Sequence, residues 1–242
     1  MNLAEYARYD ALGLAELVAK RQVGTTELAA TARAAIEKAN PAINAVVELY
    51  DDRIGKLDER TLGQGPFRGV PFLIKDVAGH EKDRAVEFGS RLAAGFVKTD
   101  ADTHIGELIR ASGVNILGRS NAPEYSMSGT AENALYGATS TPWRNGYSSG
   151  GSTGGGMAAV VAGMVPIAQG GDIAGSIRIP ASWSGGVGLK PSRGRISSGP
   201  QQDEGGFGLL MNFAQTKSVR DTAAMLDCMA RAQVGDPYQI PR

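Results

Sequence analysis

The stretch that decides the fold is YSSGGSTGGGMAAVVAGMVPIAQGGDIAGSIRIPASWSGGVGLKP, from Tyr147 to Pro191. It is rich in glycine and serine, but it also holds the apolar run AAVVAGMVPIA, which a flexible Gly/Ser linker lacks. The pattern predicts a tight loop, a small-residue helix over about 153–163 and a short buried strand over about 165–169. A second glycine-rich turn and a short helix beginning near Ser176 are expected to follow.

The second turn, GGDIAGS, has the composition of an anion-binding site. Glycines allow positive φ angles, so that several backbone N–H groups can point at one spot. Ser176 ends this turn at a predicted helix N-terminus, where its hydroxyl would lie beside those N–H groups. This arrangement suits a nucleophile with an oxyanion hole. Phosphate binding is the alternative, but the chain has neither G-x-x-x-x-G-K-[ST] nor a strand–GxGxxG–helix pattern here.

A serine nucleophile needs a base, and the sequence offers few candidates. The two histidines, His80 and His104, lie in polar surroundings without a motif, which is more typical of surface or capping histidines. Lys75 instead follows the apolar run 70–74, where desolvation would lower its pKa and make the neutral amine accessible. The alternative for Lys75 is a strand-end lysine that reaches solvent and pairs with Asp76.

Three separated motifs carry a resemblance to a known family: GVPFLIKD, GGSTGGG and GGDIAGSIRIPASWSGGVGLKP, in that order. Together they resemble the amidase signature family, whose members hydrolyse amides with a Ser–cis-Ser–Lys triad. The resemblance covers essentially the whole chain. It implies that Lys75 is the catalytic lysine, that Ser152 is the bridging serine preceded by a cis peptide bond, and that Ser176 is the acylated nucleophile.

The resemblance also implies an oxyanion hole and a substrate pocket. The oxyanion hole would be formed by the backbone N–H groups of Ile173, Ala174, Gly175 and Ser176. The pocket wall would be formed by Tyr125, Ser126, Met127, Ser128 and Gly129. Such a wall is moderately polar and leaves room for a linear or cyclic aliphatic amide.

The sequence departs from the family pattern at three points. Thr153 stands where the family usually has a second serine, although a hydroxyl is kept. Ala174 replaces the first glycine of the usual Gly-Gly-Ser turn, which favours the branch of the family that acts on cyclic nylon-related amides. Family members are also considerably longer, and the segments that complete the sheet and cover the pocket are absent from a sequence that stops at Arg242.

The implied mechanism is an acyl transfer. Neutral Lys75 accepts a proton from Ser152, whose hydroxyl accepts one from Ser176 as that serine attacks the amide carbonyl. The relay then reverses and protonates the leaving amine, and water repeats the cycle on the acyl-enzyme. The reaction calls for neither a metal ion nor a cofactor.

Composition sets wider limits on the function. The chain has 242 residues with 25 basic and 25 acidic side chains, so nothing indicates binding to nucleic acid or to an anionic membrane. The single cysteine, Cys228, excludes an intrachain disulfide and fits an amphipathic helix as a core residue. No signal segment opens the chain and no apolar run is long enough to span a bilayer, which predicts a cytoplasmic location.

The order of patterns predicts an N-terminal helical arm over 1–64 and an α/β core over 65–242. In the arm, Thr25 is expected to cap a helix that Pro41 stops, and INAVVELY is strand-like or the entry to a third helix. In the core, short apolar strands alternate with helices, which favours a mixed, mostly parallel sheet flanked by helices. The fold class is therefore α/β, with the amidase signature fold lacking its usual C-terminal part.

The function that follows is hydrolysis of the C–N bond of a small carboxylic, linear or cyclic aliphatic amide. The alternative is a non-catalytic or partner-dependent subunit with the amidase fold, including an amidotransferase A-type subunit. IRIP rather than IRQP after Ser176 points away from that amidotransferase subunit. The partners left open are a second chain supplying the C-terminal half and a second copy in a homodimer, and a chain that does not fold alone is a further alternative.

Overall fold

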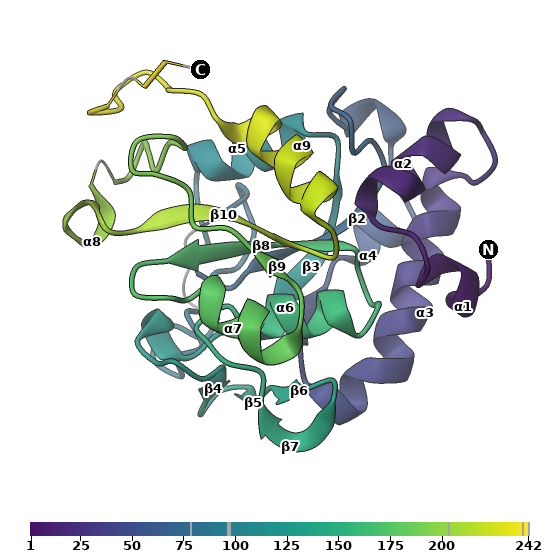
Figure 1. Cartoon of the computed structure of the whole chain (residues 1–242), viewed down its shortest axis with the longest axis horizontal. Helices are drawn as coiled ribbons and strands as arrows, with labels where there is room; N and C mark the ends of the chain where they lie inside the picture. The colour runs from purple at the N-terminus through teal and green to yellow at the C-terminus, as the bar shows by residue number, and fades with distance from the viewer. Residues whose placement is uncertain (78, 96–97, 203, 239, 242) are drawn as a thin grey trace.

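A six-stranded mixed sheet runs through the middle of the molecule (Figure 1). The structure is a computed structural model that describes residues 1–77, 79–95, 98–202, 204–238 and 240–241. The strands lie in the order β1-β3-β2-β8-β10-β9. Their bounds are Val46–Leu49 for β1, Asn115–Ser120 for β3, Pro71–Lys75 for β2, Ile167–Asp172 for β8, Met211–Thr216 for β10 and Val187–Gly188 for β9.

The sheet is mixed, as predicted, but the prediction that it is mostly parallel is wrong for the described strands. Only the central pairs β3–β2 and β2–β8 are parallel, whereas β1–β3, β8–β10 and β10–β9 are antiparallel. The chain enters β10 at the end of the sheet where β8 stops, because Met211 pairs with Asp172. A strand that starts beside the end of its neighbour must run antiparallel to it, and no helical crossover is needed.

Helices cover both faces of the sheet, and the strand residues explain which helix lies where. Leu73 and Ala168 point to one face, where they pack with α6, Gly154–Val161. On that side α6 also contacts α7, Arg178–Ser184. Phe72 and Phe213 belong to the apolar cluster of the other face, which includes residues of α5, His104–Ala111, and of α9, Val219–Met229. The alternation follows from the period of two along a strand.

The N-terminal region packs against this layered core and adds a strand to its sheet. It contains α1 (Leu3–Tyr6), α2 (Ala11–Ala19), α3 (Thr25–Ile43), β1, α4 (Asp51–Ile54) and the short 3-10 helix η1 (Glu59–Thr61). The strand reading of INAVVELY is confirmed, and α4 covers only the first part of the third helix that was the alternative.

Pro41 does not stop α3, contrary to the sequence prediction. The helix continues to Ile43 and ends at Asn44, which adopts the left-handed conformation with φ 57°. Proline has a helical φ and loses only one backbone hydrogen bond, which is a small loss two residues from a helix end. The Asn40 side chain accepts hydrogen bonds from the backbone N–H groups of Ala45 and Val46 and so supports the turn into β1.

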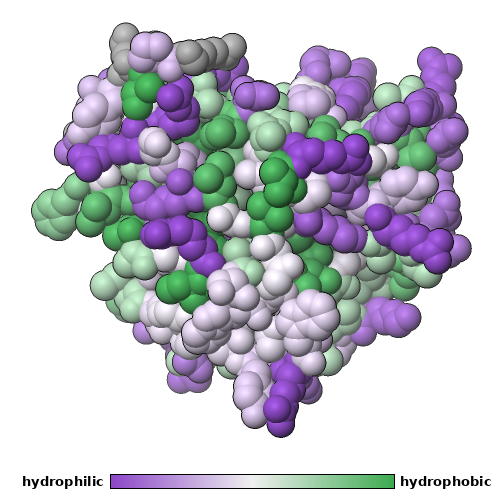
Figure 2. Space-filling model, in the orientation of Figure 1, coloured by the Kyte–Doolittle hydropathy of each residue, from purple (hydrophilic) through white to green (hydrophobic). Residues whose placement is uncertain are grey.

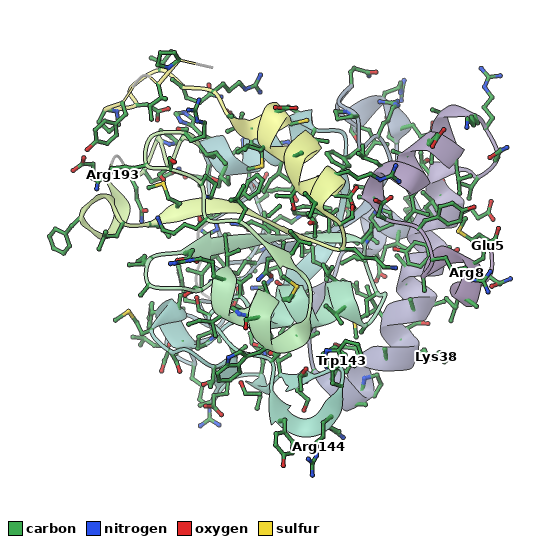
Figure 3. All side chains as sticks on the ribbon, in the orientation of Figure 1. Glu5, Arg8, Lys38, Trp143, Arg144 and Arg193 are labelled. Carbon is green, nitrogen blue, oxygen red and sulfur yellow. The ribbon has the colours of Figure 1, made fainter. Side chains whose placement is uncertain are left out.

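The remaining elements are short. They are η2 (Glu124–Ser126), β4 (Glu132–Asn133), β5 (Gly137–Ala138), β6 (Ser140–Thr141), β7 (Arg144–Ser148) and α8 (Gly205–Gly208). Residues of two of them, η2 and α8, lie beside Lys75 and Ser152. Trp143, labelled near the bottom of Figure 3, donates from Nε1 to the Ser184 carbonyl over 2.7 Å and ties the β6–β7 hairpin to α7. No helix within the described ranges is long and apolar enough to cross a membrane.

Candidate active site

The predicted catalytic residues meet where strands β2 and β8 separate. The two strands pair only at Phe72–Ile167 and Leu73–Ala168, so their carboxyl ends diverge beyond that point. Crevices at the carboxyl ends of parallel strands are the usual ligand sites of α/β sheets. Lys75 ends β2, Ser152 precedes α6, and Ser176 lies in the turn after β8.

Lys75 is buried and hydrogen-bonded to Ser152. Its Nζ lies 2.7 Å from Ser152 Oγ, and the two residues are 2% and 1% exposed. Burial lowers the pKa of Lys75 from its ordinary value to about 7, although the field of Asp172 opposes the shift. A large fraction of Lys75 is therefore neutral near pH 7 and able to accept a proton.

The alternative reading of Lys75 as an exposed strand-end lysine paired with Asp76 does not hold. The Asp76 carboxylate is itself buried and pairs with Arg119 instead. It also accepts hydrogen bonds from the backbone N–H groups of Glu87 and Gly89. Asp76 therefore organises the loop that follows β2, and Lys75 remains available to Ser152.

The segment around Ser152 has the features that the family resemblance implies. The Gly151–Ser152 peptide bond is cis. The next residue, Thr153, donates its backbone N–H to the Ser176 carbonyl over 3.1 Å. Its hydroxyl lies 3.3 Å from the Gly171 carbonyl and 3.4 Å from the Gly171 nitrogen. Threonine thus keeps supporting hydrogen bonds at the position where a second serine is usual.

Asp172 shapes the turn that carries Ser176. Its buried carboxylate accepts hydrogen bonds from the backbone N–H groups of Gly175 at 2.7 Å and Ile177 at 3.2 Å. The Arg178 side chain contacts both carboxylate oxygens at 2.9 Å. Burial alone would raise the pKa of Asp172, but these donors hold it below its ordinary value. Asp172 is not among the residues predicted from the sequence, although an aspartate that opens a glycine-rich turn of this kind is a usable signal for an Asx-type cap.

Of the four backbone N–H groups expected to form an oxyanion hole, the one of Gly175 has a hydrogen-bond partner in the structure. The N–H of Gly175 is already donated to Asp172, which leaves it poorly placed to serve a ligand. The backbone N–H groups of Ile173, Ala174 and Ser176 donate to no described residue. Gly175 adopts φ 131°, and this conformation, which favours glycine, lets the turn fold back over Asp172.

A pocket of about 570 Å³ opens above these residues and is lined by Lys75, Ser152 and Ser176. Ile173 and Ala174 line it as well. The whole predicted wall also faces it: Tyr125, Ser126, Met127, Ser128 and Gly129.

Phe88, which the sequence analysis did not single out, also lines the pocket. Its ring stacks on Tyr125 with centroids 5.5 Å apart. The Tyr125 N–H donates to the Phe88 carbonyl, which fixes the two loops against each other. Residue 88 carries no motif of its own, so only the folded chain reveals it.

Neither histidine acts as a base for the two serines in the described contacts. His80 lines the pocket, where burial lowers its pKa to about 4 and keeps it neutral at pH 7. The expectation that His80 is a surface or capping residue is therefore corrected. His104 opens α5, and its Nδ1 lies 2.8 Å from Ser197 Oγ. The described residues contain no group of three or more His, Cys, Asp or Glu side chains arranged to hold a metal ion.

Comparisons with known proteins agree with this geometry. The family model described as Amidase matches residues 27–242. The 6-aminohexanoate-cyclic-dimer hydrolase of Paenarthrobacter ureafaciens is 40% identical over 96% of this chain and 47% of its own length. The acylamidase of Rhodococcus erythropolis is 36% identical over 95% of this chain and 49% of its own.

The fold comparison gives the same relationship. A solved structure of 6-aminohexanoate cyclic dimer hydrolase complexed with substrate superposes with a TM-score of 0.91 and 38% identity. The superposition covers 98% of this chain and 49% of the chain of the solved structure. The chain therefore spans about half the length of the relatives that it matches.

Proposed function

This chain belongs to the amidase signature family, and from that membership we propose that it hydrolyses the C–N bond of a small amide through an acyl-enzyme on Ser176. The observation that carries the proposal is the buried Lys75 Nζ–Ser152 Oγ hydrogen bond of 2.7 Å beside Ser176 in one pocket. A lysine with a pKa of about 7 is suited to general-base work near neutral pH.

In the proposed mechanism, Ser176 Oγ attacks the amide carbonyl while its proton passes to Ser152, and Ser152 passes its own proton to Lys75. The backbone N–H groups of Ile173, Ala174 and Ser176 are the candidate donors for the developing oxyanion. Removing one such donor typically costs about 3–4 kcal/mol of transition-state stabilisation. Lys75 then returns the proton through Ser152 to the leaving amine, and water hydrolyses the acyl-enzyme in the same way.

The proposed substrates are small carboxylic amides and linear or cyclic aliphatic amides. The names of the compared relatives, a cyclic-dimer hydrolase and an acylamidase, support this class. A pocket of about 570 Å³ is also in the size range of small-molecule sites. Apolar side chains such as Phe88, Ile179 and Leu210 would contact the hydrocarbon part, whereas the serines and backbone would orient the amide.

We propose that full turnover also requires the part of the relatives that this chain does not match. That part, whether a continuation of this polypeptide or a separate one, would complete the pocket wall. Exposed apolar side chains at the pocket mouth support the proposal, because Met127 is 85% and Ile173 is 44% exposed. A partner-dependent subunit is therefore the second candidate function.

The test is labelling of the chain with a fluorophosphonate probe, followed by intact-mass spectrometry under denaturing conditions. We expect one adduct on this chain, and we expect Ser176→Ala and Lys75→Ala to abolish it. The labelling rate should rise with pH through about 7, because Lys75 must be neutral to act as a base. Ser192→Ala, which changes an exposed loop serine, is the matched control and should keep the adduct.

An unlabelled wild-type chain would refute activity of the chain by itself. If labelling appeared only after addition of a second polypeptide, the partner-dependent candidate would be correct. A companion chain would be visible in the same mass spectrum.

A further inference from the structure

Gln169 is a fully buried glutamine on β8 that contacts the end of β2. It is 0% exposed, and its Oε1 accepts a hydrogen bond from the backbone N–H of Lys75 over 2.9 Å. The parallel pairing of the two strands ends at Leu73–Ala168, one residue before Gln169 on β8 and two residues before Lys75 on β2. The glutamine side chain therefore bridges the gap that opens between the strands.

Where β2 and β8 separate, the backbone N–H of Lys75 has no strand partner on the side of β8. A buried backbone N–H without an acceptor is costly, so a strand that leaves its neighbour needs another partner. On its other side β2 still pairs with β3 as far as Lys75–Ser120. Gln169 supplies an acceptor for the Lys75 N–H on the open side, and β2 can diverge without losing it.

The loop after Lys75 closes tightly on the same amide. A Cβ atom at Gly79 would lie 2.5 Å from Gln169 Nε2, so only glycine fits there without displacement. Gln169 Nε2 is buried and has no hydrogen-bond partner among the described residues. Within the described part of the chain, the amide is thus held by packing and by its one hydrogen bond, from the Lys75 N–H.

We propose that Gln169 is a positioning residue that anchors the backbone of Lys75 where β2 leaves β8 and so holds the Lys75 amine in its buried place against Ser152. The proposal rests on the proposed function, because it takes Lys75 to be the base. Gln169 acts through Lys75 and is not assigned a contact with substrate.

The electrostatic surroundings of Lys75 are simple enough for this role to be measured. Nζ bonds to Ser152, and Asp172 is the charged group whose field acts on Lys75. That carboxylate is paired with Arg178. A change at Gln169 leaves all three side chains in place, so an altered Lys75 titration would report a changed position of the amine.

The experiment is an NMR titration of the chain labelled with 13C at lysine Cε, with the Lys75 signal identified by its loss in Lys75→Met. In Gln169→Met, which keeps the length and removes the acceptor, we expect the Lys75 midpoint to rise by about one unit or more, because a released amine gains water. Asn115→Met is the matched control: Asn115 is also fully buried, donates to the Arg53 carbonyl over 3.0 Å, and has an Oδ1 atom without a partner in the described chain.

Gly79→Ala is the second variant, because it keeps Gln169 but pushes its amide aside. The proposal is supported if either Gln169→Met or Gly79→Ala raises the Lys75 midpoint while Asn115→Met leaves it within about 0.3 unit of wild type. It is overturned if folded Gln169→Met and Gly79→Ala both keep the wild-type midpoint. The titration needs no turnover, so a wild-type chain without a probe adduct would refute activity of the chain by itself and leave this result readable.

Discussion

At the scale of single residues, burial of Lys75 imposes a cost on the folded protein. Its pKa in the folded chain is about 7, against 10.5 for an unhindered lysine. Between these two pH values the unfolded chain binds more protons than the folded chain. By linkage, the contribution of Lys75 to stability therefore rises with pH through this window and is least favourable below pH 7.

Lys75→Met should remove that cost and the catalytic base together. We expect the variant to be about 1–3 kcal/mol more stable than wild type at pH 6, because an apolar side chain of similar length replaces a buried cation. The gap should narrow as the pH rises from about 7 to above 10.5, because only there is the wild-type amine neutral in both the folded and the unfolded state. Urea denaturation at pH 6 and pH 9 measures it. A gap that stayed the same at both pH values would contradict a pKa lowered by burial.

At the scale of secondary-structure elements, Arg119 joins four segments around the site. It projects from β3 and pairs with Glu48 of β1 over 2.6 Å, with Glu87 over 2.8 Å and with Asp76 after β2. Arg119 is 4% exposed and Asp76 is 1% exposed. Burial raises the pKa of Asp76 despite the nearby guanidinium, so this carboxylate is poorly solvated and depends on its hydrogen-bond partners.

Arg119→Met should destabilise the fold by roughly 3–5 kcal/mol, because it leaves the Asp76 carboxylate buried without its cation. The loss should shrink as the pH falls, since protonated Asp76 needs no counter-charge. Thermal or urea unfolding across pH 5–8 provides the measurement. Arg60→Ala is the control, because Arg60 and its partner Asp58 have side chains that are 90% and 45% exposed. It should change stability by no more than about 0.5 kcal/mol, and an equal loss in both variants would show that Asp76 does not depend on Arg119.

The same scale shows what the sequence could predict. Apolar periodicity and glycine punctuation indicated α6, β8 and β2, because these signals are local along the chain. The resemblance then assigned Lys75 and Ser152, which the fold brings into contact.

Other features depend on contacts between distant segments, and no local pattern predicts them. The direction of β10 follows from where the chain enters the sheet, and the burial of Lys75 decides against pairing with Asp76. The bond from the Gly175 N–H to Asp172 is different, because it spans three residues and the aspartate that opens the turn was a usable local signal for it. Gln169 also had no signature, because its role depends on the point at which β2 separates from β8.

At the scale of the whole molecule, the chain combines a net charge near zero with exposed apolar side chains. Formal net charge is zero at pH 7 and the isoelectric point is about 6.8, so electrostatic repulsion between copies is weakest near neutral pH. Figure 2 shows hydrophobic side chains at the left edge of the view, over α8. Met127 and Ile173 line the pocket, and Phe207 and Leu209 are chain neighbours of its lining residues Gly206 and Leu210. We define the mouth patch as Met127, Ile173, Phe207 and Leu209, which are 85%, 44%, 97% and 50% exposed.

We expect this patch to limit the solubility of the chain near its isoelectric point, since exposed apolar patches promote association when repulsion is low. Solubility measured from pH 5 to 9 should be lowest near pH 6.8. Phe207→Lys should raise the solubility at this pH several-fold. Val234→Lys adds the same charge at a side chain that is 98% exposed but outside the mouth patch, so it separates the effect of charge from that of the apolar surface. If the two variants raised solubility equally, charge alone would explain the gain, and the mouth patch would not be an association surface.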